Sequence, residues 1–258
     1  MELREWAIRI LSANTLEDKL FSSELLVDNN PGEPLIWQMP TRPPGMDFRR
    51  HTREEKLPPL HELHNLDKRG ICLHRFAGHE LLAVEIMAFA LLAFPDAPKH
   101  FRKGLANTLR EEQGHVKIYM RRLAEMGLSF GDLPLYRHFW AYTPFMTTPA
   151  QYVSIMSLTF EMANLDFAPL YGQAFARFGD GESEALMNQI YQDELSHVAF
   201  GWQWLRKYFP QEEDLWKKWT EQLPPRMLPK RAKGFLYFPE NRRQAGLPEE
   251  WVINLKKA

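Results

Sequence analysis

The chain is poor in cysteine, in net charge and in long apolar runs, and each shortage argues against a kind of structure or partner. Of its 258 residues only Cys72 is a cysteine, so no intramolecular disulfide can form, which is typical of a reducing cytoplasm. The formal net charge of −1 gives no electrostatic reason to expect nucleic acid or an anionic membrane as a partner. No uninterrupted apolar run reaches the roughly 18 residues of a membrane span, and the N-terminus lacks the apolar core of a signal peptide. We therefore expect a cytoplasmic protein without a transmembrane helix.

Proline is plentiful, but it is unevenly distributed. Most of the 19 prolines fall within residues 31–59 and 224–248, where regular helices are therefore not expected. Elsewhere the apolar residues recur with a helical period. This pattern predicts four long helices, over residues 70–94, 99–127, 149–178 and 182–208. Within the third, Pro169 should kink the helix and free the carbonyl of Leu165.

These helices predict an all-α protein built around a four-helix bundle. Residues 61–209 would form the bundle, because antiparallel neighbours joined by short loops pack in this way. Residues 1–60 would supply short N-terminal helices and a Pro-rich arm. Residues 210–258 would form a C-terminal arm packed on the bundle, since they contain too little apolar surface for a separate core.

Two Glu-x-x-His motifs lie 82 residues apart within the predicted bundle. The first is Glu112-Gln113-Gly114-His115 and the second is Glu194-Leu195-Ser196-His197. Each follows a lone glutamate on the preceding helix, Glu80 in the first case and Glu161 in the second. A Glu from each of two helices and a Glu-x-x-His from each of the other two form the ligand set of a two-metal carboxylate site in a bundle.

The bundle region also repeats internally. A shift of 81 residues places Glu80 on Glu161 and Glu85 on Asp166, and a shift of 82 places Glu111-Glu112 on Asp193-Glu194. Two equivalent helical hairpins imply a pseudo-two-fold axis that runs through the site.

The spacing of each motif suits metal binding. Residues three apart on an α-helix differ by about 60° around the axis and about 4.5 Å along it, so both can reach one ion. Each candidate carboxylate interrupts an apolar stripe, and packing should turn it inward. Buried ionised carboxylates are costly unless cations neutralise them, and mixed carboxylate and imidazole ligands suit Fe or Mn. We predict two divalent metal ions, iron or manganese, in a catalytic centre formed by Glu80, Glu112, His115, Glu161, Glu194 and His197. The alternative is that these are solvated surface residues.

Two further acidic residues precede the motif glutamates. Ligating histidines usually donate their other N–H to a carboxylate or a carbonyl. We expect Asp193 to orient His115, and Glu111 to do the same for His197. For Glu111 the alternative is an ordinary surface glutamate.

Glu85 and Asp166 recur in both repeats, five residues after Glu80 and Glu161. They lie about 140° around the helix from those glutamates and cannot easily share their metal. We expect each to pair with a basic group between helices, such as Arg110 or Arg121.

Four segments carry a resemblance to the ferritin-like superfamily: residues 79–85, 111–115, 160–166 and 193–201. The chain resembles most closely a bacterial ferritin-like family usually labelled a domain of unknown function, over roughly residues 60–258. This resemblance implies a di-iron site with the six ligands named above. In that family an arginine often stands where this chain has Asn164. The chain is more remotely similar to the tRNA hydroxylase branch, which hydroxylates a prenylated adenosine. Its basic clusters are too short for us to infer that substrate.

These observations favour a di-metal oxidoreductase that activates dioxygen and hydroxylates or oxidises an unidentified small or apolar-bodied substrate. Electrons would come from an unidentified donor, and the long arms suit a homodimer or a covered active site. Two alternatives remain open. One is a non-catalytic protein that binds metal or handles iron. The other is a scaffold or binding module in which metals only stabilise the bundle and the site is coordinatively saturated.

Overall fold

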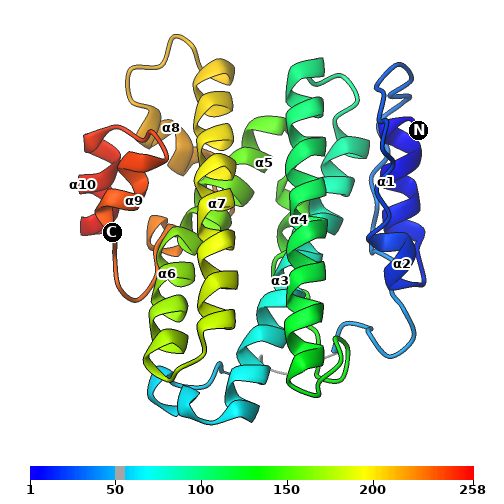
Figure 1. Cartoon of the computed structure of the whole chain (residues 1–258). Coiled ribbons are helices and arrows are strands. Elements are labelled where there is room, and N and C mark those ends of the chain that lie inside the picture. Colours follow the sequence, from blue (N-terminus) through cyan, green and yellow to red (C-terminus); the bar gives the residue numbers. More distant parts are fainter. Residues whose placement is uncertain (50–55) are drawn as a thin grey trace. The chain divides into compact units, whose positions relative to one another are not determined.

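A computed structural model describes residues 1–49 and 56–258 of the chain. Part of the predicted Pro-rich arm therefore lies outside the described residues. The described residues contain helices and two isolated β-bridges but no β-strand, which confirms the all-α fold class. They divide into two compact units, Met1–Thr143 and Pro144–Ala258 (Figure 1).

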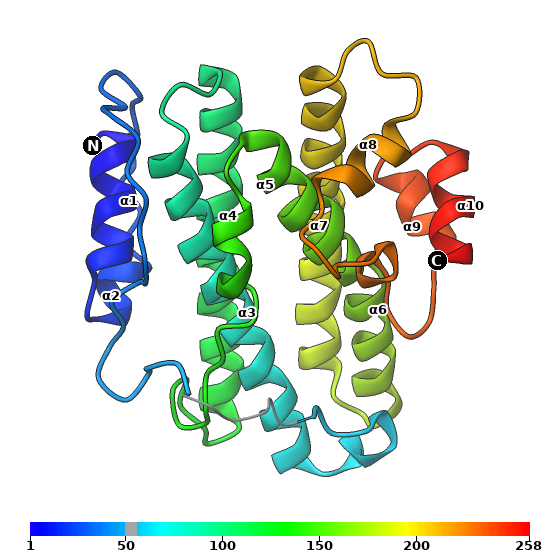
Figure 2. The ribbon, with the colours of Figure 1, turned by 180° about the vertical axis from the view of Figure 1, so that it is seen from behind.

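The first unit is centred on two long helices, α3 (Leu66–Ala93) and α4 (Lys99–Glu125), which pack together as a hairpin (Figures 1 and 2). Helix α1 (Leu3–Ser12) packs on α3. The shorter elements are α2 (Leu16–Lys19) and the 3-10 helices η1 (Leu60–His64) and η2 (Trp140–Phe145), the last of which crosses into the second unit.

Helix α3 is the most apolar element of the chain. By length and composition it could cross a membrane, but 94% of its most apolar window is buried inside the protein. A helix that is apolar on all sides is typical of a protein core. Its N-terminus is capped by Asn65, whose side chain accepts a hydrogen bond from the Asp67 amide.

The second unit contains the other long hairpin, formed by α6 (Met162–Arg177) and α7 (Gly181–Tyr208). A short helix α5 (Pro149–Ile155) and a π-helical segment η3 (Met156–Glu161) lead directly into α6. The remaining elements follow α7: α8 (Leu215–Gln222), the 3-10 helix η4 (Pro229–Ala232), α9 (Pro239–Gln244) and α10 (Glu249–Lys257).

The four long helices lie close to where the sequence predicts them, with two differences. The predicted helix 149–178 begins as expected, with Thr148 accepting from the Gln151 amide and Pro149 in the first turn. It then changes to π-helical bonding before it continues as α6. The first long helix also begins four residues earlier than predicted, at Leu66. The predicted bounds of the bundle and its arms stay a prediction.

Candidate metal centre

In the first unit, three of the predicted ligands lie together. Glu80 comes from the middle of α3, and Glu112 and His115 come from adjacent turns of α4. The Nδ1 atom of His115 lies 3.2 Å from Oε2 of Glu112 and 3.7 Å from Oε2 of Glu80. All three side chains are buried, and one ligand atom from each lies within 4.8 Å of the others. This group could hold a metal ion, and we call it the first half-site.

The first half-site has the electrostatics of a cation site. Burial raises the pKa of Glu80 well above its ordinary value, and the neighbouring Glu112 carboxylate raises it further. The hydrogen bond with His115 acts in the opposite direction. Two buried carboxylates at this distance disfavour each other's charge, whereas a divalent cation between them would favour both charges.

In the second unit, the other three predicted ligands lie together, and we call them the second half-site. Glu161 is the last residue of η3, and Glu194 and His197 lie on α7. The Nδ1 atom of His197 is 3.4 Å from Oε2 of Glu194, and a carboxylate oxygen of Glu161 lies within 4.8 Å of a His197 ring nitrogen. Each of these side chains is at least 96% buried (4%, 1% and 1% exposed).

Asn164 is part of the second half-site. Its side-chain amide donates to Oε1 of Glu194 at 2.8 Å. The resemblance described above implies that an arginine is common at this position. A neutral amide can orient Glu194 without adding a positive charge beside it, so the negative charge of the carboxylate remains available to a cation.

The π-helical segment places Glu161, and it is stabilised by groups distant in sequence. In η3 the Met162 amide donates to the Ser157 carbonyl, five residues earlier. The change of bonding pattern leaves the Ser154 carbonyl to other donors, and it accepts from Thr159 Oγ1 at 2.8 Å and from Trp219 Nε1 at 3.1 Å. Short π-helical segments within α-helices occur frequently at functional sites.

Gly201 allows α7 to approach this segment closely. A Cβ atom at Gly201 would lie 2.3 Å from the Cβ of Ser157, a distance that side chains do not tolerate. The sequence places Gly201 on the same seam as Glu194 and His197, but gives no sign of the π-helical segment that it faces. Ser154 and Thr159, two polar residues within an apolar stretch, were the available signal.

The structure therefore gathers the predicted ligands into two groups of three, one in each unit. The union of the two half-sites in one two-metal centre stays a prediction. The expected contacts of Asp193 with His115, and of Glu111 with His197, join residues of different units and also stay predictions.

Glu85 pairs with basic groups as expected, but the suggested partners are wrong. Its carboxylate lies 2.9 Å from Lys19 Nζ and 2.5 Å from Arg42 Nη2, and neither Arg110 nor Arg121 is its partner. Arg110 instead donates to Ser22 and Ser23. The cations come from the N-terminal segment, which the spacing of residues within α3 and α4 could not indicate.

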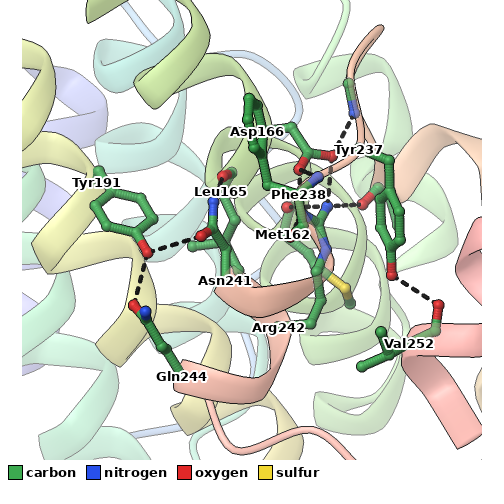
Figure 3. Close-up of polar contacts among 12 residues, drawn as sticks. Met162, Leu165, Asp166, Tyr191, Tyr237, Phe238, Asn241, Arg242, Gln244 and Val252 are labelled. Atoms are coloured by element: carbon green, nitrogen blue, oxygen red, sulfur yellow. Dashed lines mark hydrogen bonds and ion pairs between the residues drawn. The ribbon is translucent and has the colours of Figure 1, made fainter. Parts of the chain in front are cut away.

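Among the described residues, the cationic partner of Asp166 is Arg242 of α9, and the two form a buried ion pair (Figure 3). Asp166 also accepts hydrogen bonds from the backbone amides of Gly234 and Phe238. The prediction that Asp166 pairs with a basic group is confirmed, again with a partner other than Arg110 or Arg121. The C-terminal segment thus binds directly to the helix that follows Glu161.

Pro169 has the predicted local effect on hydrogen bonding. It has no amide to donate to the Leu165 carbonyl four residues earlier. That carbonyl instead accepts from the Asn241 side chain at 2.5 Å (Figure 3).

A family model described as a protein of unknown function (DUF455) matches residues 5–253 of the chain. This confirms the resemblance to a family of unknown function, over a longer stretch than the sequence motifs indicated. Ferritin-like superfamily membership stays a prediction. No curated protein and no solved structure matches the chain.

Proposed function

The chain belongs to the DUF455 family, and we propose that it is a cytoplasmic di-metal oxidoreductase that uses dioxygen to hydroxylate or oxidise a small, apolar-bodied substrate. One observation carries the proposal. The same ligand set, a glutamate and a Glu-x-x-His pair, is gathered and buried in each of the two units.

The composition of the ligand set supports two divalent ions. Four carboxylates and two imidazoles would balance two divalent cations, and the absence of cysteine among them argues against a structural zinc site. Oxygen and nitrogen ligands of this kind suit iron or manganese. When bound, these metals would supply the redox chemistry with dioxygen, which protein side chains alone do not provide.

The residues of the chain would hold and orient the metals. Glu80, Glu112 and His115 would hold one ion, and Glu161, Glu194 and His197 would hold the other. Asn164 would orient the Glu194 carboxylate through its hydrogen bond to Oε1, which leaves Oε2 without that donor. Burial of all six ligands would exclude bulk water from the reaction.

The test is metal content per chain, measured by mass spectrometry on protein expressed with added iron and manganese. We expect about two metal ions per chain, the stoichiometry of the two-metal carboxylate sites. Glu112→Ala and Glu194→Ala should each lower this content, and Glu182→Ala, an exposed residue of α7, should not. A protein that binds no metal under these conditions, or variants that keep both ions, would overturn the proposal.

Oxygen consumption separates catalysis from its alternatives. A catalytic centre loaded with ferrous iron should consume dioxygen repeatedly when a reductant is supplied. An iron-handling protein should consume dioxygen only until its ferrous iron is oxidised, and a saturated structural site should not consume it. Sustained consumption that is lost in Glu112→Ala would favour the oxidoreductase.

A further inference from the structure

A pocket of about 650 Å³ lies in the first unit, lined by residues of two segments that are distant in sequence. Its volume is within the range of small-molecule sites, roughly 300–1,000 Å³. The lining residues are Met39, Pro40, Arg42, Asp47, Phe48, Arg49 and Arg137. None of them is a predicted metal ligand.

A short backbone pairing brings the two segments together. Phe48 and Leu135 form an isolated parallel β-bridge, and the Arg49 amide donates to the Leu135 carbonyl at 3.0 Å. This alignment carries Arg49 and Arg137 to the same pocket. Both side chains are exposed, so they can meet a ligand that arrives from solvent.

Arg42 is the buried residue of the pocket, with only 7% of its surface exposed. Its Nη2 atom donates to Glu85, and its guanidinium lies over the Phe48 ring at 3.9 Å. Its Nε and Nη1 atoms are buried and have no hydrogen-bond partner among the described residues. A buried donor without an acceptor is costly, and each instance calls for an explanation.

The charges around Arg42 are unbalanced. Lys19 and Arg42 share one carboxylate, Glu85, and all three side chains are almost completely buried. Among the described lining residues, Arg42 and Arg137 face one acidic residue, Asp47. Arg137 makes no ion pair with any described residue. The pocket therefore has an excess of positive charge, some of it buried, where an anion would be favourable.

We propose that this pocket binds a small organic anion. A carboxylate or phosphate group would be held by Arg42 and Arg137, whose forked donors match both groups. An apolar body attached to that group would pack on Met39, Pro40 and Phe48. The site is separate from the metal centre and does not depend on the proposed oxidoreductase activity.

Calorimetric titration of the full chain tests the proposal with four probes: benzoate, phenyl phosphate, inorganic phosphate and benzyl alcohol. Benzoate or phenyl phosphate should bind saturably, and the tighter of the two identifies the preferred acidic group. Inorganic phosphate should bind more weakly because it lacks the apolar body. Benzyl alcohol should not bind, because it lacks the charge.

Charge variants at the rim of the pocket provide matched controls that leave the buried ion pairs intact. Arg137→Gln should weaken binding about tenfold, because the variant loses one charge-assisted hydrogen bond to the anion. Asp47→Asn should strengthen binding about twofold by removing a repulsive charge. Arg121→Gln removes an exposed arginine of the same unit outside the pocket, and it should leave binding unchanged.

The proposal would be overturned by no saturable binding of either aromatic anion at millimolar concentration, or by equal affinities in Arg137→Gln and Arg121→Gln. Anions can also bind at a metal ion, so the titrations are repeated after dialysis against a chelator. Binding in the pocket should survive the chelator. Binding that disappears with the metal would reject the pocket while supporting the metal centre, which keeps the two proposals distinguishable.

Discussion

Arg242 and Asp166 form an ion pair in which neither side chain reaches solvent, although 76 residues separate them. Arg242 also donates to the carbonyls of Met162 and Ala232, both at 3.0 Å. Met162 directly follows Glu161, so the C-terminal segment stabilises the first turn of α6 beside a predicted ligand (Figure 3). Gly234 makes this approach possible, because a Cβ there would lie 2.8 Å from the Cβ of Asp166.

Replacing Arg242 with alanine should therefore be severely destabilising. The change leaves Asp166 buried without its cation and removes donors from two carbonyls, for an expected loss of about 3–5 kcal/mol in the free energy of unfolding. Urea denaturation measures this loss. Arg243→Ala is the control: among the described residues, Arg243 pairs with the exposed Glu240 and Glu249, so its loss should lower stability far less. Equal losses in the two variants would show that the buried pair has no special role.

Gly201→Ala should disturb the second half-site. The new methyl group would overlap Ser157 and force α7 away from the π-helical segment that ends at Glu161. Overpacking of this kind costs about 1–3 kcal/mol, and the cost should appear in the free energy of unfolding. Metal content measured on the same protein should fall, because Glu161 and His197 would move apart.

The control for this change lies on the same helix. A Cβ at Gly181, the first residue of α7, would meet no described atom within 4 Å. Gly181→Ala should therefore change the free energy of unfolding by no more than about 0.5 kcal/mol. If Gly201→Ala is as stable as this control and binds as much metal, the close approach of Gly201 to Ser157 does not matter for the metal site.

Trp219 should contribute more to stability than its ring alone accounts for. Its Nε1 atom donates to the Ser154 carbonyl at 3.1 Å, which the change to π-helical bonding leaves available. Trp219→Phe should cost about 1 kcal/mol beyond the loss of packing. Trp251→Phe is a matched control. Trp251 is also almost completely buried, and its ring centroid lies 5.1 Å from that of Trp219. The Trp251 N–H donates to no described residue. Denaturation curves that coincide for the two variants would contradict a role for the hydrogen bond.

The sequence predicts the features that depend on local spacing. The four long helices follow from apolar periodicity and from proline and glycine positions, and the members of each half-site follow from the i, i+3 spacing and the internal repeat. The free Leu165 carbonyl follows from Pro169 alone, because proline has no backbone N–H to donate to the residue four positions earlier. Its actual partner, Asn241, could not be predicted because the contact spans 76 residues.

Features that arise from long-range packing were missed. The π-helical segment changes the backbone hydrogen bonds of about one helical turn but hardly alters the spacing of the apolar residues. Apolar periodicity therefore does not reveal it. Glu85 and Asp166 were correctly expected to pair with cations. Their partners Lys19, Arg42 and Arg242 lie outside the four long helices and 43 to 76 residues away in sequence, so spacing within the long helices does not indicate them.

His74 should make stability depend on pH. Burial lowers its pKa from an ordinary 6.5 to about 4, and its Nε2 atom accepts hydrogen bonds from the Gly131 and Leu133 amides. Between these pH values the unfolded chain takes up a proton that the folded protein does not. Stability is therefore fully present above pH 6.5 and is lost as the pH falls toward about 4.

The loss attributable to His74 should reach about 3 kcal/mol at most, at 1.36 kcal/mol for each unit of difference in pKa. Urea denaturation across this pH range measures it. Carboxylates also titrate in the acidic part of the range, so the informative quantity is the difference from His74→Gln, which retains an acceptor but cannot take up the proton. The variant should lose less stability than the wild-type protein as the pH falls. Parallel pH profiles would mean that the folded protein protonates His74 as readily as the unfolded chain does, and that the two amide hydrogen bonds do not hold it neutral.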